Sequence, residues 1–302
     1  MKLSKAVQVQ TQKVAIIGLP GSGKTTLAAA LAAKFRLHWI DVERGSVALF
    51  KLPAEAQANV DLIQLPDSAS YPIAADTLAN FFKLGKMNVC HAHGKHECTI
   101  CKKSAPEAFD SLDTALLDSN DIVVIDSGTQ WSNSILAHIM KAKSVDAKPE
   151  RDDWGALRKH TEFALSQMQA VQYNLVVIFH AQEAALEDGK TKLVPTFGSA
   201  SMSTEVAKAF DHMVYCDIRN RKHVAFSSSV ALPNVMTKSR LDFEIEKLAV
   251  PSLIPVFDGS LLVHAAPSAG ELITEAVKAE VPKANLTPAQ QALANLKNGV
   301  KK

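Results

Sequence analysis

The stretch KVAIIGLPGSGKTT, Lys13–Thr26, decides the fold that this 302-residue sequence encodes. Its first six residues form a short, branched, apolar run closed by glycine, which predicts a buried strand. The following residues match G-x-x-x-x-G-K-[ST] and lead into KTTLAAALAAKF, whose alanines and leucines predict a helix. A strand, a glycine-rich turn and a helix in this order predict a loop that binds phosphate groups, rather than an ordinary glycine-rich turn.

The residues of this loop have distinct expected roles in binding a nucleotide. The glycines allow consecutive backbone N–H groups to face phosphate oxygens. The positive end of the helix dipole also favours the negative charge of the phosphate. Lys24 is expected to reach the β- and γ-phosphates, and the Thr25 hydroxyl is expected to bind Mg²⁺. The predicted nucleotide-binding residues of the loop are Gly18, Pro20, Gly21, Ser22, Gly23, Lys24, Thr25 and Thr26.

Two further acidic residues complete the predicted catalytic site. The apolar run DIVVID ends in Asp126, which is suited to bind Mg²⁺ directly or through water; the alternative is an aspartate that caps the next element. Asp41 and Glu43 follow the strand-like run LHWI, and the carboxyl ends of parallel strands face the crevice where ligands bind. Glu43 is therefore a candidate general base, against the alternative of a solvated acid in a loop.

Strand-like and helix-like segments alternate through most of the chain, and this alternation predicts an α/β fold with a mainly parallel sheet covered by helices. Helices are expected in DTLANFFKLGK, PEAFDSLDTALLDS and DWGALRKHTEFALSQMQAVQY, and an antiparallel extension in the late segments HMVYCDIR, HVAFSSS and NVMTKSR. The predicted parts are an N-terminal tail (1–12), an ATPase core (13–264), and a flexible tail (265–302) with a short helix at TPAQQALANLKN.

Composition limits the function classes that remain. The net charge of +2 restricts any nucleic-acid surface to a local patch. No apolar run is long enough to span a bilayer, and the N-terminus lacks a signal-peptide core, so a cytoplasmic location without membrane contact is expected. Four cysteines in a chain of this length do not indicate a disulfide framework; clustered cysteines in a reducing compartment indicate metal or redox chemistry.

Three of the cysteines lie in CHAHGKHECTIC, within a predicted insertion at residues 86–104 between two expected helices. Cys90, His93, Cys98 and Cys101 read C-x₂-H-x₄-C-x₂-C, a full tetrahedral ligand set for a structural Zn²⁺. His91 and His96 compete with His93 for the fourth position. A reactive dithiol is the main alternative to a zinc knuckle, and an unremarkable surface loop is the other. Cys216, alone in MVYCDI, is expected to be a buried strand residue.

Four stretches resemble the RecA-like ATPases, and more narrowly the small phage recombination proteins of the Sak type, which are relatives of RecA and RadA. They are GLPGSGKTT, WIDVERG, VVIDS and MTKSR, and the resemblance runs from about Lys13 to Leu248. It implies a phage- or bacterium-encoded ATPase that acts in DNA recombination or single-strand annealing. ATP would lie between subunits of a homo-oligomeric ring or filament on single-stranded DNA, and a single-strand binding protein is a further expected partner.

The same resemblance implies roles for individual residues. Glu43 would activate the attacking water, and Lys238 and Arg240 would reach the γ-phosphate of a neighbouring subunit, like an arginine finger supplied in trans. His180 and Gln182 would sense the γ-phosphate at the end of a strand that leads to a DNA-binding loop, and Phe50 would stack on the base.

The two DNA-binding loops are placed by position alone, at residues 141–153 and 183–203. Both segments are polar and longer than ordinary turns, which favours either a function or disorder. They bring Lys141, Lys143, Lys190 and Lys192, but only Phe197 as an aromatic residue, so phosphate contacts would have to dominate. A helicase core or helicase loader, and a nucleotide-dependent switch, remain alternative functions.

Overall fold

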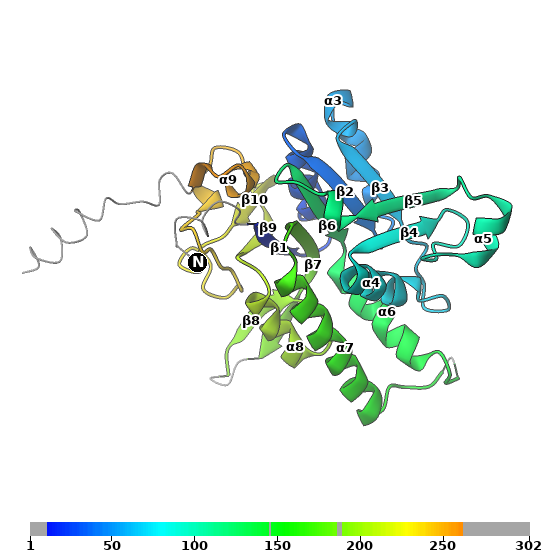
Figure 1. Ribbon diagram of the computed structural model, residues 1–302. Coiled ribbons are helices and arrows are strands. Elements are labelled where there is room, and N and C mark those ends of the chain that lie inside the picture. The colour runs from blue at the N-terminus through cyan, green and yellow to red at the C-terminus, as the bar shows by residue number, and fades with distance from the viewer. Residues whose placement is uncertain (1–10, 145, 186–188, 262–302) are drawn as a thin grey trace, which may run out of the picture. The chain divides into compact units, whose positions relative to one another are not determined.

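An eight-stranded, mostly parallel sheet carries the fold (Figure 1). The structure, a computed structural model, describes residues 11–144, 146–185 and 189–261. Seven strands follow the spatial order β10-β9-β1-β7-β6-β2-β3, and β8 pairs with the distal half of β7. Only β10 and β8 pair antiparallel in this sheet. The predicted fold class, α/β with a mainly parallel sheet and an antiparallel part toward the C-terminal side, is confirmed.

The strands come from the predicted apolar runs and from segments that the sequence did not mark as strands. Those of the large sheet are β1 (Lys13–Gly18), β2 (Arg36–Asp41), β3 (Val60–Gln64), β6 (Asp121–Asp126), β7 (Asn174–Ala185), β8 (Thr191–Pro195), β9 (His212–Arg219) and β10 (Lys222–Phe226). A separate two-stranded sheet consists of β4 (Lys86–Cys90) and β5 (Phe109–Asp113).

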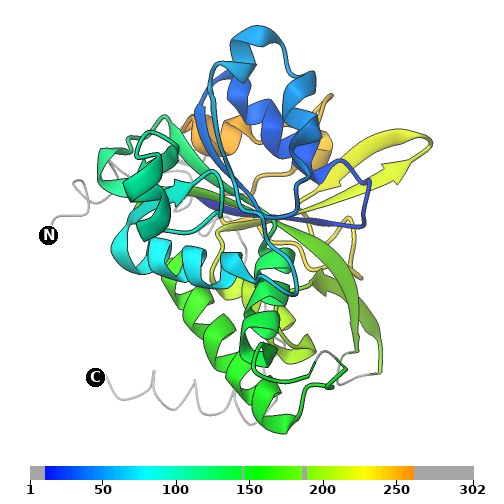
Figure 2. The ribbon, with the colours of Figure 1, turned by 90° about the vertical axis from the view of Figure 1, so that its right-hand side faces the viewer.

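Helices cover both faces of the large sheet, as Figures 1 and 2 show. One face carries α2 (Lys24–Ala29), its 3₁₀ continuation η1 (Ala30–Ala33), η2 (Ser46–Lys51), α3 (Ala54–Gln57), η5 (Ile245–Lys247) and α9 (Ile254–Phe257). The opposite face carries α4 (Ile73–Leu84), α6 (Gly128–Met140), α7 (Arg151–Ala170), α8 (Ala200–Glu205) and η4 (Val206–Lys208). The remaining short helices are α5 (Thr99–Ser104) and η3 (Thr114–Leu116).

Alternation along the central strands divides the core into two layers. In β1, Ala15 and Ile17 pack with the α4–α6–α7 layer, while Val14 and Ile16 pack with the α2 layer. The same division continues along β6 and β7, because successive side chains of a strand point to opposite faces. Strands that bury both faces must be apolar throughout, which is why these runs could be recognised from the sequence.

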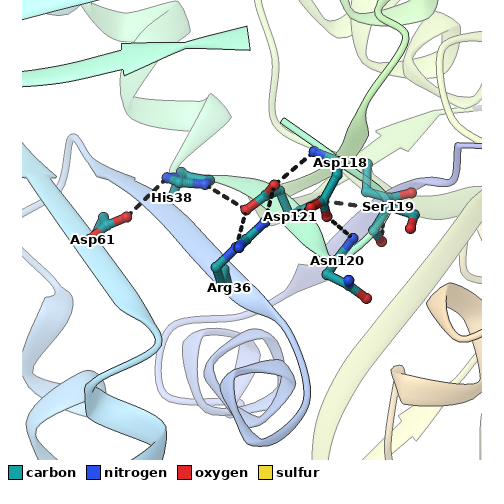
Figure 3. Close-up of polar contacts among 8 residues, drawn as sticks. Arg36, His38, Asp61, Asp118, Ser119, Asn120 and Asp121 are labelled. Atoms are coloured by element: carbon teal, nitrogen blue, oxygen red, sulfur yellow. Dashed lines mark hydrogen bonds and ion pairs between the residues drawn. The ribbon is translucent and has the colours of Figure 1, made fainter. Parts of the chain in front are cut away.

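At the amino end of the sheet, charged groups from β2 and β6 form a paired network (Figure 3). The Arg36 guanidinium donates to both carboxylate oxygens of the buried Asp121 at 2.7 and 2.8 Å, and to Asp118 at 2.9 Å. His38 lies between Asp121 and Asp61, with its ring nitrogens 3.0 and 3.3 Å from their oxygens. Burial raises the pKa of Asp121, but the bonds from Arg36, the Asp118 backbone and His38 outweigh it and hold that pKa at about 2.

The Cys/His segment lies in a β-hairpin, which corrects two expectations. PEAFDSLDTALLDS was predicted to be a helix, but it forms β5 and η3 instead. The Cys/His segment therefore connects the two strands β4 and β5, and not two helices as expected. Tertiary packing explains the error: Met87, Val89 and Leu112 bury one side of the hairpin in the core that contains α4, and cross-strand pairing with β4 overrides the helical character of the segment.

Two other segments differ from prediction. NVMTKSR was expected to be a strand, but it makes only isolated bridges, Leu193 to Val235 and Met213 to Lys238. Residues 183–203 were expected to be a loop, but their described part contains the end of β7, all of β8 and the start of α8. The predicted C-terminal helix and the first ten residues lie outside the described residues. Within the described part of the chain, no helix combines the length and apolarity needed to cross a membrane.

Candidate nucleotide site and cysteine cluster

The parallel register brings the predicted catalytic residues to the carboxyl end of the sheet. Gly18 at the end of β1 lies opposite His180 on β7, and Asp126 at the end of β6 lies opposite Asp41 on β2. Glu43 follows two residues after Asp41, and its backbone N–H donates to the Asp126 carbonyl at 3.2 Å. Residues from distant parts of the chain therefore meet at one edge, where ligands of open α/β sheets bind.

The loop at Gly18–Thr25 has the geometry that a bound phosphate requires. Gly21 and Gly23 adopt positive φ angles of 77° and 94°, and their backbone N–H groups donate to no described residue. The Ser22 hydroxyl is buried without a hydrogen-bond partner among the described residues. The Lys24 ammonium donates to the Leu19 carbonyl at 2.9 Å, and burial lowers its pKa. Unpartnered donors and a buried cation together fit a polyphosphate.

Thr25 and Asp126 provide the oxygen atoms that a magnesium ion would take. The Thr25 hydroxyl donates to an Asp126 carboxylate oxygen at 3.0 Å. Burial, with a further contribution from the negative charge of Glu43, raises the pKa of Asp126 to about 7. A hydroxyl and a buried carboxylate without a paired cation form a donor set suited to Mg²⁺, which prefers a few protein oxygens together with substrate phosphates.

Glu43 is held by two hydrogen-bond donors. His180 Nε2 lies 3.0 and 3.3 Å from the two carboxylate oxygens, and the Ser127 hydroxyl donates to one of them. Burial raises the pKa of Glu43, but the bonds from His180 and Ser127 outweigh it, so the pKa lies below its usual value. The carboxylate is therefore ionised at neutral pH, as a general base must be. Sequence reasoning placed Glu43 and His180 here but missed Ser127, whose only signal is its position directly after Asp126.

Other predicted site residues lie elsewhere or have partners of their own. Pro20 and Thr26 are exposed on the loop and at the start of α2, and Phe50 on η2 is 67% exposed. The Gln182 amide donates to the Ser203 hydroxyl at 2.7 Å, which ties β7 to α8. Asp41, fully buried, accepts hydrogen bonds from the Gly45 and Ser46 backbone, so it shapes the segment that follows Glu43.

Lys238 and Arg240 were predicted on a strand of the antiparallel extension, but they lie outside any strand, near the amino end of β9. The Lys238 ammonium donates to the Ala207 and Phe210 carbonyls at 2.8 and 2.6 Å. Arg240 pairs with Asp211 at 2.7 Å, and its side chain is 55% exposed. Both residues thus stabilise the entry into β9 within their own chain. They lie at the opposite end of β9 from the position that pairs with Gly18, so they do not contribute to the chain's own nucleotide site.

Cys90, His93, Cys98 and Cys101 form a cluster whose ligand atoms lie within 4.8 Å of one another. His93 Nδ1 is 3.8, 3.6 and 3.2 Å from the sulfurs of Cys90, Cys98 and Cys101. Neighbouring ligand atoms of a tetrahedral zinc site are separated by roughly 3.5 Å, given Zn–S and Zn–N bonds of about 2.3 and 2.0 Å. Donor types and spacing both fit Zn²⁺, and the described residues hold no other such group of metal-binding side chains.

The structure also decides between the competing histidines. His91 Nε2 pairs with Asp110 at 3.0 Å, and His96 Nδ1 accepts the Asn88 backbone N–H at 3.2 Å, so neither faces the thiols. A hydrogen bond from the Cys101 backbone N–H lowers the pKa of the Cys98 thiol, whereas burial raises the pKa of the Cys101 thiol.

The Cys/His segment, residues 90–101, packs against the segment that follows β3. At Gly94, with φ at 62°, an added Cβ would lie 2.1 Å from the Pro66 ring, so only glycine permits this contact. Asp67, the next residue along, accepts hydrogen bonds from Ser134 and Gln130 of α6 at 2.7 and 2.9 Å. The hairpin is thereby docked onto the helix layer through a few contacts.

The fold and the site define an ATP-hydrolysing P-loop enzyme. Comparison with known families matches residues 10–241 to the family described as AAA domain, and because this match spans more than half of the chain, the chain belongs to that family. No curated protein matches the chain in sequence.

Three solved structures resemble the chain weakly over 95% of its length. One is a prototypical ATPase from the type III secretion system of pathogenic bacteria, at 14% identity and TM-score 0.38 over 73% of that chain. The others are the assembled ATPase EscN of the enteropathogenic E. coli type III secretion system, alone at 14% identity and TM-score 0.37, and with its central stalk EscO at 13% and 0.38. Each EscN comparison covers 60% of the EscN chain. Similarity at this level does not transfer a function.

Proposed function

We propose that this enzyme is a RecA-like ATPase of the Sak type that binds single-stranded DNA, with ATP held between subunits of a homo-oligomer. The observation that carries the proposal is the contact between Glu43 and His180. His180 ends the parallel part of β7, and the same strand continues from Ala181 into a hairpin with β8. Strand β7 therefore carries both the histidine that contacts Glu43 and the start of a segment proposed to contact DNA. A shift in that segment would reach the Glu43 carboxylate through His180.

The chemistry at the base follows from the side chains around it. Glu43, ionised and held by two donors, accepts the proton of the water that attacks the γ-phosphate. Lys24 and the loop N–H groups stabilise the charge on the phosphate oxygens. Mg²⁺, bound through Thr25 and Asp126, would neutralise charge on the β- and γ-phosphates. His180 and Ser127 orient Glu43.

The two proposed DNA segments extend from the same end of the core, the lower end in both Figure 1 and Figure 2. The connection from α6 to α7 borders a groove. The polar residues that line this groove include Lys141 and Lys143 from the connection, Asn133 from α6 and Ser70 from the segment before α4. Lys143 is paired with Glu150 and Asp153, so Lys141 is the more available cation of the two. Binding there would rest on phosphate contacts and would weaken steeply with salt.

The proposal is tested by measuring ATP turnover and strand binding together. Single-stranded DNA should stimulate turnover, and binding should require ATP and fall with rising salt. His180→Ala should lower turnover without DNA, because Glu43 loses one of the two donors that orient it. It should also abolish the stimulation of the remaining turnover by DNA, because the link between Glu43 and the hairpin is lost. Lys159→Ala, on the exposed face of α7, is the matched control. Preference for duplex, or turnover indifferent to single strands, would reject the DNA-coupled function.

The subunit arrangement requires a separate experiment. A Lys24→Ala protein and an Arg240→Ala protein should each be inactive alone and regain activity when mixed, because some interfaces then join an intact loop to an intact Arg240. A cation at the γ-phosphate can contribute as much as ~10³–10⁵ in rate. Asp211→Asn is the control, since it breaks the Arg240 pair but keeps the guanidinium. Full activity of Arg240→Ala, or equal loss in Asp211→Asn, would limit Arg240 to its structural role.

The cysteine cluster is proposed to bind one structural Zn²⁺. The four ligand atoms lie within 4.8 Å of one another, and a closed set of four protein ligands leaves no open position for substrate. Apart from its packing on α4, the hairpin is polar, so metal binding would contribute to its folding energy.

A further inference from the structure

A histidine from the antiparallel edge of the sheet contacts the phosphate-binding loop. His223 lies on β10, two strands away from β1, which carries the loop. Its Nδ1 is 3.1 Å from the carbonyl oxygen of Ser22. The residue lies 201 positions along the chain from Ser22, so no local sequence signal connects the two.

The acceptor identifies where the hydrogen lies. A backbone carbonyl oxygen only accepts hydrogen bonds, so the proton of this bond must be on Nδ1 of His223. The ring therefore acts as a donor that holds the Ser22 carbonyl toward β10.

Holding this carbonyl also determines the direction of the next N–H group. The peptide bond between Ser22 and Gly23 is trans, because the only cis bond among the described residues is elsewhere. In a planar trans peptide, the C=O and the following N–H point in opposite directions. The Gly23 N–H consequently points away from His223, and it donates to no described residue. It is one of the unpartnered N–H groups that fit a phosphate oxygen.

The contact is too close to accommodate a side chain at Gly23. A Cβ added there would lie 2.8 Å from Nδ1 and 3.2 Å from Cγ of His223. The imidazole therefore lies directly beside the Gly23 backbone.

We propose that His223 is a positioning residue of the nucleotide site, which fixes the Ser22–Gly23 peptide so that its N–H faces the bound phosphate. His223 need not touch the nucleotide itself. It acts through the loop, so its loss should weaken ATP binding more than the chemical step, which depends on Glu43 and Asp126 at neighbouring strands.

Two variants of nearly equal shape separate the hydrogen bond from packing. His223→Asn places an amide donor near the position of Nδ1, whereas His223→Leu has the same branching without a donor. His223→Leu should raise KM for ATP, and the Kd of a fluorescent ATP analogue, by roughly 3- to 10-fold, the range that the net contribution of one hydrogen bond corresponds to. Its kcat should stay within about twofold, and His223→Asn should restore KM to within about twofold of the unsubstituted protein.

Lys222→Ala is the control for any effect of altering β10, because Lys222 precedes His223 and points to the other face of the strand. The proposal is overturned if His223→Leu leaves KM and Kd unchanged, or if the Asn and Leu variants raise them equally. It is equally overturned if kcat falls as far as KM rises. Both variants keep a branched side chain at an exposed position, and circular dichroism establishes that they fold before kinetics are compared.

Discussion

Strand β6 carries a buried aspartate at each end, and the two have opposite electrostatic environments. Asp121 at the amino end is paired with Arg36 and His38, and its pKa is held at about 2 (Figure 3). Among the residues that the structure describes, Asp126 at the carboxyl end has only the Thr25 hydroxyl as a direct side-chain partner, and burial raises its pKa to about 7. Both residues are only 2% exposed, but the Asp126 carboxylate lies deeper in the protein than that of Asp121, so burial accounts for part of the difference in pKa.

The other part of the difference in pKa lies in whether the protein supplies a cation. Arg36 on β2 lies opposite Asp121 in the register, whereas the residue opposite Asp126 is another acid, Asp41. The nearby Glu43 adds further negative charge, and Lys24 offsets only part of it. The amino end is thus electrostatically complete, while the carboxyl end lacks positive charge that Mg²⁺ would supply. A buried, uncompensated carboxylate in a cleft identifies a functional site better than a buried carboxylate alone.

The largest expected effect concerns catalysis at the carboxyl end. Glu43→Gln should reduce ATP turnover by roughly 10²–10⁴-fold while nucleotide binding is kept, because the amide cannot accept the proton from water. Single-turnover assays and binding titrations measure the two separately. Lys24→Ala is the comparison variant, in which binding and turnover should fall together. Normal turnover in Glu43→Gln would remove Glu43 from the mechanism. It would also weaken the inferred difference between the amino and carboxyl ends of the sheet.

The cysteine cluster extends the comparison, since it too brings ligand atoms together without a cation from the protein. One zinc ion per chain should co-purify, as metal analysis can determine. Cys98→Ser should lower zinc affinity by at least about 10-fold and loosen the hairpin, because a hydroxyl is a weaker zinc ligand than a thiolate. Cys216→Ser is the matched control, since that thiol lies in β9 outside the cluster.

Turnover should stay within about threefold in Cys98→Ser, because the hairpin contacts the core mainly through Pro66 and α4. The absence of zinc in protein purified without chelator, with every thiol freely titratable, would reject the metal site.

Exchanging each aspartate of β6 for asparagine should give opposite results. Asp121→Asn should lower the free energy of unfolding by about 2 kcal/mol, because the pairing with Arg36 is lost. It should leave the turnover of the folded protein intact. Asp126→Asn should abolish most turnover but raise the thermal midpoint of the nucleotide-free protein by roughly 2–4 °C, since a buried charge is removed. Chemical and thermal unfolding, together with ATPase assays, would measure both. Equal destabilisation by the two substitutions would show that the two ends do not differ as inferred.

The smallest effect is the pH dependence of stability at the amino end. The folded pKa of Asp121 is about 2, against an ordinary value of 3.8, so its carboxylate form stabilises the folded state. This contribution is complete above the unfolded pKa and is lost as the pH falls through the folded pKa. The difference in unfolding free energy between the unsubstituted protein and Asp121→Asn should therefore be larger at pH 6 than at pH 3. A difference that does not change with pH would assign the effect to packing.

The amino-acid sequence determined the parts of this protein whose physics is local. The glycine-rich loop needs its residues consecutively, and a strand buried on both faces needs a continuous apolar run, so Lys24, Thr25 and Asp126 could be identified directly. The four candidate zinc ligands lie within twelve residues for the same reason. Glu43 could be identified as a candidate general base because it closely follows a strand that ends at the same edge of the sheet as β1.

Other features were decided only by tertiary structure. Residues 109–113 have helix-compatible neighbours, but pairing with β4 and packing against α4 make them a strand. Lys238 and Arg240 look free in sequence, yet the folded chain uses them to bind carbonyls and Asp211 around the start of β9. His93 displaces His91 and His96 because the hairpin turns only that ring toward the thiols. His223 meets the loop across two strands, since sheet order places residues 201 positions apart in contact and no sequence spacing records it.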